Sequence, residues 1–97
     1  MEIKKIAEGS KLTIAVEGRL DTNTVPELQK EVVSLDNIDE LVFDFSNLVY
    51  ISSAGLRVLM IAKKGMSGKG DVKIINASDD VKEIFDITGF SSILTIE

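Results

Sequence analysis

Two short runs of alternating polar and apolar residues begin the chain, at residues 2–7 and 11–18. In the second run Leu12, Ile14 and Val16 recur at every other position, which places their side chains on one face of a strand. Three polar or small residues separate the two runs. The pattern predicts an antiparallel β-hairpin whose second strand ends at the glycine that closes the run.

The next apolar residues recur at three- and four-residue spacing and predict a helix over residues 24–34. Thr24, Pro26 and Glu27 have the order of a capping box with a proline in the first turn. The apolar positions that share one face of this helix are Val25, Leu28, Val32 and Leu35. We expect this face to be buried against the sheet.

A third strand and a second helix follow in the middle of the chain. Residues 40–45 contain the apolar run Leu41-Val42-Phe43, as expected of a strand that is covered on both sides. Apolar residues return at helical spacing from Leu56 onward, and Gly65 is expected to end that helix. The turn Ser-Ser-Ala-Gly at 52–55 directly precedes the helix, and we expect Ser53 to cap its first turn.

The last third of the chain repeats the same alternation. Residues 72–75 form a short apolar run, and Ser78 precedes a helical pattern at 79–88 that Gly89 terminates. Residues 93–96 predict a final edge strand.

The predicted order of elements is β-β-α-β-α-β-α-β. This order is typical of an α/β domain in which helices pack against a mixed β-sheet. A chain of 97 residues is long enough for one hydrophobic core and too short for two. We therefore expect a single domain over residues 1–97.

Composition excludes several classes of function. The chain has no histidine and no cysteine, so the usual general base and the thiolate metal sites are absent. A net charge of −5 argues against nucleic acid as a partner, because phosphate backbones require clustered lysine and arginine. No apolar run reaches the roughly 20 residues of a membrane span. We expect a cytoplasmic, non-enzymatic protein that uses no cofactor and binds other proteins.

The serine turn is a candidate catalytic site. A serine between a strand and a helix resembles the nucleophile elbow of hydrolases, but Ile51 stands where that motif has glycine. No histidine can activate Ser53, and Lys63 and Lys64 would lie ~15 Å away along the same helix. Nucleophilic catalysis is therefore disfavoured.

Two further sites are also disfavoured. The glycine-rich segment 65–70 contains a lysine but lacks the spacing of a nucleotide-binding loop, and it precedes a strand rather than a helix. Asp21, Asp79 and Asp80 are candidate metal ligands, although the last two are explained as carboxylates that stabilise the start of a helix.

Residues 44–59, with the sequence DFSNLVYISSAGLRVL, resemble the signature of the STAS domain in bacterial anti-sigma factor antagonists. That signature is a strand ending in D-x-S, followed by D-S-[ST/A]-G-[LI] at the start of a helix. The segment GRLD at 18–21 is similar to the family's G-x-[LIF]-D motif. In an alignment on Gly55, the family's phosphorylated serine corresponds to Ser53, and Ser52 replaces the usual acidic residue. The family commonly has one more helix at its end.

The resemblance implies a protein-binding switch. Such an antagonist binds an anti-sigma factor with serine kinase activity and thereby frees the sigma factor. Phosphorylation, here at Ser53, ends the binding, and a metal-dependent serine phosphatase resets the protein. An alternative within the same family is a small subunit that binds the ATPase of a lipid-transporting ABC assembly.

Partner binding is expected at the carboxyl ends of the central strands, where open α/β sheets usually carry their sites. This location places the loop after the second strand beside the serine turn. The residues expected to bind a partner are Asp21, Thr22, Asn23, Ser52, Ser53, Gly55 and Arg57.

Overall fold

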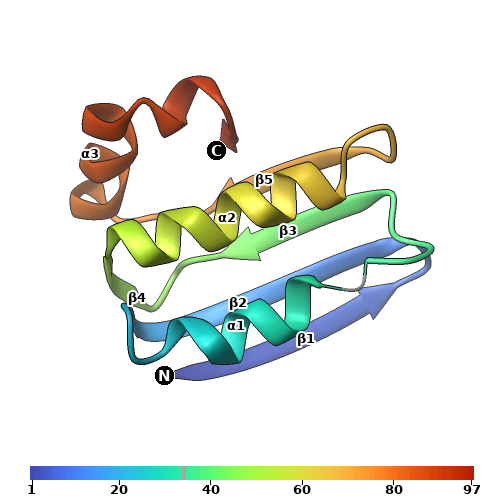
Figure 1. Cartoon of the computed structure of the whole chain (residues 1–97), viewed down its shortest axis with the longest axis horizontal. Helices are drawn as coiled ribbons and strands as arrows, with labels where there is room; N and C mark the ends of the chain where they lie inside the picture. The colour runs from blue at the N-terminus through green and yellow to red at the C-terminus, as the bar shows by residue number, and fades with distance from the viewer. Residues whose placement is uncertain (34) are drawn as a thin grey trace.

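A computed structural model describes residues 1–33 and 35–97 and shows one mixed β-sheet with helices packed against it (Figure 1). The strands are β1 (Glu2–Glu8), β2 (Lys11–Leu20), β3 (Glu40–Asp44), β4 (Leu48–Ile51), β5 (Asp71–Ile75) and β6 (Thr95–Ile96). Their order in the sheet is β1-β2-β3-β5-β6, and β4 pairs with β2. Only the β1–β2 pair is antiparallel among the described pairs. The predicted hairpin and the predicted mixed sheet are confirmed.

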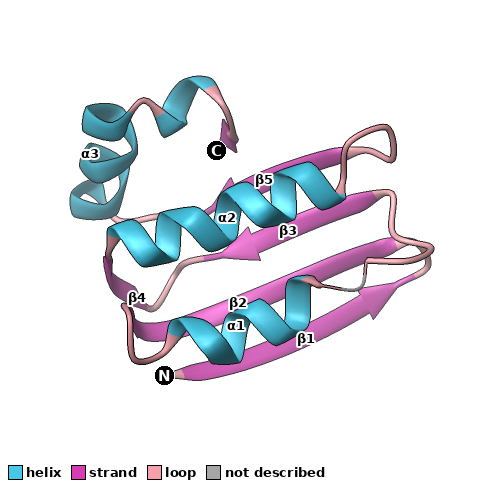
Figure 2. Cartoon of the chain, viewed as in Figure 1, coloured by secondary structure: helices cyan, strands magenta, loops and turns pink. Residues whose placement is uncertain are grey.

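Helices α1 (Val25–Val32) and α2 (Ser53–Gly65) lie side by side on one face of the sheet (Figure 2). Helix α3 (Asp79–Thr88) lies beyond the end of β5 and is followed by the short 3-10 helix η1 (Phe90–Ser92). Because β2, β3 and β5 are paired in parallel, they run toward the same edge of the sheet, and α2 and α3 begin at this edge. We call this edge the carboxyl edge of the sheet.

The core lies between the sheet and the helices. Ile14, Phe43 and Ile74 are paired across β2, β3 and β5, and each is fully buried. The aromatic rings continue this core toward α3, because Phe45 lies 5.9 Å from Phe43 and 6.5 Å from Phe85 between ring centroids. One continuous core thus joins all three helices to the sheet.

The structure corrects the predicted end of the second strand. Strand β2 does not end at Gly18 but continues to Leu20, because β4 supplies a parallel partner for its last three residues. Strand β4 itself was not predicted. Its exposed Val49 and Tyr50 interrupt the apolar alternation that would have indicated a half-buried strand.

The first helix also differs at both ends. The capping box is wrong: the Thr24 side chain caps no helical amide, because it is already bonded within the preceding loop. The helix ends at Val32, before the expected end near Ser34, and Ser34 lies outside the described residues. The apolar face is confirmed, since Leu28 and Val32 are buried.

The prediction for the last third is largely confirmed. Ser78 accepts a hydrogen bond from the Val81 amide, α3 spans 79–88, and Gly89 adopts a left-handed conformation with φ of 83°. The final strand is shorter than predicted, because η1 and the turn after it occupy the residues before Thr95.

Candidate functional site

The carboxyl edge brings two distant segments together. Leu20, at the end of β2, is paired with Ile51, at the end of β4, and both side chains are buried. The Ser52 amide donates a hydrogen bond of 2.9 Å to the Leu20 carbonyl oxygen. The loop at 21–24 and the serine turn therefore begin side by side, as predicted from the sequence.

Local hydrogen bonds hold the loop at 21–24 in one conformation. The Asp21 carboxylate accepts from the amides of Asn23, at 3.0 Å, and Thr24, at 3.2 Å. The Thr24 hydroxyl donates to the Arg19 carbonyl oxygen at 2.8 Å and accepts from the Asp21 amide at 2.9 Å. Thr22 and Asn23 are exposed at the tip of this loop. The loop thus presents polar groups on an ordered backbone.

The two serines of the turn have different roles. Ser52, not Ser53, is the N-cap of α2, and its hydroxyl oxygen accepts from the Gly55 amide at 3.4 Å. Extended backbone angles at Ser52 allow its side chain to fold back over the first turn. Ser53 is the first helical residue and is exposed. The expectation that Ser53 caps the helix is therefore wrong.

Gly55 and Arg57 occupy opposite faces of α2. Gly55 is buried, and a Cβ atom at this position would lie 2.8 Å from Ile51 Cγ1 and 2.9 Å from Leu20 Cγ. Gly55 therefore lets α2 pack closely on the ends of β2 and β4 and presents no side chain to a partner. Arg57 is exposed one turn after Ser53, on the surface that the serine turn begins.

Two features of this edge were not predicted from the sequence. The first is a set of hydrogen bonds to the Asp44 carboxylate from the hydroxyl and amide of Ser46 and from the Asn76 side chain. Burial alone would raise the pKa of Asp44, but these hydrogen bonds outweigh it and hold the pKa below its ordinary value. The ends of β3 and β5 are joined in this way.

The second feature is a contact between Arg19 and Tyr50. The Arg19 guanidinium carbon lies 4.4 Å from the centre of the Tyr50 ring, and Arg19 Nε lies 3.7 Å from Asp21 Oδ2. Arg19 and Tyr50 are register partners on β2 and β4. Only the pairing of these strands, which the sequence pattern did not reveal, brings the two side chains together.

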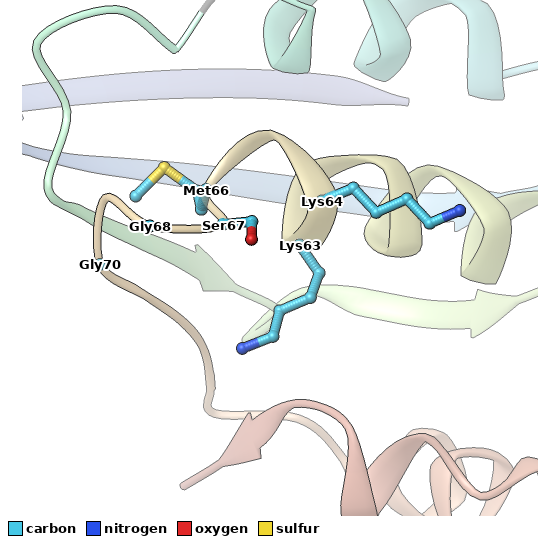
Figure 3. Close-up of a pocket in the computed structure, with 6 residues that line it drawn as sticks. All are labelled: Lys63, Lys64, Met66, Ser67, Gly68 and Gly70. Atoms are coloured by element: carbon cyan, nitrogen blue, oxygen red, sulfur yellow. The ribbon is translucent and has the colours of Figure 1, made fainter.

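The glycine-rich segment lines a shallow hollow of about 340 Å³ at the far end of α2 (Figure 3). The side chains of Lys63 and Lys64 point in different directions around it. The amides of Ser67, Lys69 and Gly70 donate to carbonyl oxygens of the helix end and of the loop itself. These amides already donate hydrogen bonds within the chain, whereas the amides of a phosphate-binding loop point together toward the ligand.

Neither a metal site nor a membrane span is found in the part of the chain that the structure describes. Residues 1–33 and 35–97 contain no group of three or more acidic side chains placed to hold an ion. No helix within these same residues has the length and apolarity needed to cross a membrane.

Comparisons with known proteins agree on the class of domain. The family model of the STAS domain matches residues 2–97. The chain therefore belongs to the STAS domain family, and its fold is the fold of that family.

Individual proteins and solved structures are also similar to this chain. The chain is 33% identical over 88 residues to BtrV of Bordetella bronchiseptica, which is named an anti-sigma factor antagonist; the alignment covers 88% of this chain and 76% of BtrV. Among solved structures, the unphosphorylated form of the anti-sigma factor antagonist SpoIIAA has a TM-score of 0.85 at 15% identity, covering 99% of this chain and 88% of that one. The phosphorylated form of SpoIIAA from Bacillus has a TM-score of 0.76 at 14% identity, covering 99% and 91%.

Proposed function

We propose that this protein is an anti-sigma factor antagonist controlled by phosphorylation at Ser53. In its unphosphorylated form it binds an anti-sigma factor that has serine kinase activity, which releases the sigma factor. Phosphorylation ends this binding, and a metal-dependent serine phosphatase restores the first form. The identity to BtrV, which extends over most of both chains, supports the antagonist role.

The observation that carries this proposal is the contrast between Ser52 and Ser53. The Ser52 hydroxyl accepts the capping hydrogen bond of α2, whereas no hydrogen bond to the Ser53 hydroxyl occurs within residues 1–33 and 35–97. Ser53 is also the more exposed of the two. A kinase can therefore reach the Ser53 hydroxyl without breaking a contact that the fold needs.

The position also suits a phosphate physically. Ser53 lies in the first turn of a 13-residue helix, where unpaired amides and the helix dipole favour negative charge. A phosphate adds about −1.5 to −2 charges. The fold is expected to tolerate this charge, so its effect is exerted on the partner. Weakening a complex a hundredfold requires only about 2.7 kcal/mol.

The proposed interface is formed by the loop at 21–24, the serine turn and the exposed face of α2. Its members are Asp21, Thr22, Asn23, Ser52, Ser53 and Arg57, with Gly55 setting the close packing beneath them. The ordered backbone of the loop supports this role, because a preformed surface loses less conformational entropy on binding.

Phosphorylation is tested by incubating the protein with ATP and each serine-kinase anti-sigma factor encoded in the same genome. We expect one phosphate on the wild-type chain and none on Ser53→Ala. Ser52→Asp is the matched control, since it removes the other hydroxyl but keeps a side chain that caps the helix. Phosphate that persists in Ser53→Ala and disappears in Ser52→Asp would move the site to Ser52.

The binding surface is tested with Arg57→Glu, which reverses the charge beside the serine turn. We expect weaker binding to the anti-sigma factor and a melting temperature close to that of the wild type, because Arg57 is exposed. Lys64→Glu is the matched control, an exposed cation at the other end of α2. Equal affinities of the wild type and Arg57→Glu would exclude this face of α2 from the interface.

A further inference from the structure

The residue types that dominate protein interfaces are concentrated at one place in this chain. The sequence has one tyrosine, no tryptophan and two arginines, and the other nine of its eleven cations are lysines. Tyrosine and arginine are enriched among the residues that contribute most to binding, whereas lysine is depleted at interfaces. The tyrosine is Tyr50 on β4, Arg19 is its register partner on β2, and Arg57 lies one helical turn after Ser53 on α2.

Tyr50 and Arg19 form a preassembled pair on the surface. Leu20 and Ile51 face the core, so the preceding residues Arg19 and Tyr50 point to the opposite side of the paired strands. Tyr50 remains 37% exposed and the Arg19 side chain 60% exposed. The Arg19 guanidinium lies against the Tyr50 ring, with its Nε turned toward Asp21.

This arrangement leaves part of the guanidinium free for a ligand. The face of the group is occupied by the Tyr50 ring, and its Nε edge is directed at the Asp21 carboxylate. The terminal N–H groups of Arg19 take part in no hydrogen bond or ion pair among the described residues. Arginine in such a fixed orientation is suited to bind a carboxylate with two parallel hydrogen bonds.

Tyr50 and its neighbour Val49 are the exposed apolar residues of β4, and Val49 is 66% exposed. An exposed aromatic ring next to an exposed aliphatic side chain provides apolar surface for a partner to bury. Burying these short or rigid side chains costs little conformational entropy. The surface thus combines a free arginine edge with an apolar patch.

We propose that Arg19 and Tyr50 anchor the partner protein, with Arg19 binding a partner carboxylate and Tyr50 and Val49 contacting an apolar side chain next to it. This inference rests on the proposed function, since its partner is the same anti-sigma factor. It extends the interface from the serine turn onto the face of β2 and β4 that points away from the core.

The location of this anchor also accounts for the direction of the switch. Ser53 is three positions after Tyr50, so their Cα atoms lie at most ~11 Å apart. Arg57 lies one helical turn beyond Ser53. A phosphate on Ser53 therefore adds its negative charge close in the chain to both Tyr50 and Arg57, where it repels a partner carboxylate bound nearby.

The anchor is tested by titrating the anti-sigma factor into purified variants with melting curves as a check of folding. We expect Tyr50→Ala and Arg19→Ala each to weaken binding tenfold or more, and Tyr50→Phe to stay within threefold of the wild type. The double variant should lose less than the product of the two single losses, because the residues act together. Ile6→Ala is the matched control, an exposed apolar side chain on β1, and should bind within twofold of the wild type.

A second measurement follows the environment of Tyr50 by ¹⁹F NMR and changes the side chain only by one fluorine atom. Because Tyr50 is the only tyrosine, growth on 3-fluorotyrosine places one fluorine reporter in the chain. We expect its ¹⁹F resonance to shift when unlabelled anti-sigma factor is added, and to return when Ser53 is phosphorylated.

The outcomes separate the two proposals. An unmoved resonance, or twofold or smaller effects of Tyr50→Ala and Arg19→Ala while Ser53→Asp binds poorly, overturns the anchor and leaves the proposed function standing. A wild-type chain that binds none of the anti-sigma factors encoded in its genome overturns both.

Discussion

The Ser52 amide and the Leu20 carbonyl oxygen are joined by a hydrogen bond of 2.9 Å, which links the end of β2 to the start of α2. This bond sets the loop at 21–24 beside the serine turn, although the two segments are far apart in the sequence. The exposed hydroxyl of Ser53 thereby becomes part of a surface built from two β-α connections rather than an isolated helix end.

The cap of α2 predicts a loss of stability on substitution of Ser52 and little change on substitution of its neighbour Ser53. Ser52→Ala removes the oxygen that accepts from the Gly55 amide, so we expect a loss of about 1 kcal/mol of unfolding free energy. In a domain of this size, that loss corresponds to a fall of roughly 4–8 °C in the melting temperature. Ser53→Ala should change the melting temperature little, because Ser53 provides no cap and alanine suits a helix. Thermal melts in one buffer compare the two, and a larger effect at Ser53 would contradict this assignment of the cap.

The close packing around Gly55 predicts that even an alanine at this position destabilises the fold. In Gly55→Ala the new Cβ atom would lie 2.8 Å from Ile51 and 2.9 Å from Leu20, both within the core. We expect a loss of about 1–3 kcal/mol of unfolding free energy from overpacking, despite the better helix propensity of alanine. Denaturant titration measures the change.

Gly65→Ala is the matched control for that substitution. Gly65 is the last residue of the same helix, and its added Cβ would make an ordinary contact of 3.5 Å with Leu35. We expect this variant to be as stable as the wild type or more stable. Equal effects at the two glycines would show that packing at the carboxyl edge is not the cause.

The hydrogen bonds to Asp44 predict a contribution to stability that depends on pH. Because folding lowers the pKa of this carboxyl, its contribution is fully present above the unfolded pKa of about 3.9 and is lost as the pH falls through the folded value. We therefore expect the difference in melting temperature between the wild type and Asp44→Asn to be largest near neutral pH and to shrink below about pH 4.

Ser46→Ala provides an independent check on the same group. Removing the Ser46 hydroxyl deletes one of the hydrogen bonds that favour the charged carboxylate. The Asp44 pKa should rise, which a ¹³C titration of the side-chain carboxyl detects. An unchanged titration midpoint would contradict the role of Ser46.

Ser53→Asp separates a regulatory serine from a purely structural one. Aspartate is accepted in the first turn of a helix, so unfolding free energy should stay within about 0.5 kcal/mol of the wild type. Binding to the anti-sigma factor should weaken by about 1–3 kcal/mol, less than with a true phosphate, which carries more charge. Ser53→Ala should retain binding. Calorimetric titration of both variants decides the matter, and equal affinities would remove the basis for a switch at Ser53.

Several features of this protein follow from the sequence by itself. Apolar periodicity predicts the hairpin, the three helices and the central strand, because side-chain spacing directly reflects the repeat of each element. Ser78 and Gly89 mark both ends of α3 for local reasons, a capping oxygen and a left-handed backbone. The motif at 44–59 also indicates the family that the comparisons confirm.

Other features depend on contacts that only the folded chain makes. The sequence does not distinguish Ser52 from Ser53 as the cap. That choice depends on a long-range contact: the Ser52 amide bonds to the Leu20 carbonyl oxygen, and the helix begins at the next residue. Nor does the sequence reveal β4 or the extension of β2, since each is a strand only through pairing with the other. The contact between Arg19 and Tyr50 follows from that same pairing. Local spacing determines the elements of this protein, whereas long-range strand pairing decides which side chains meet at its site.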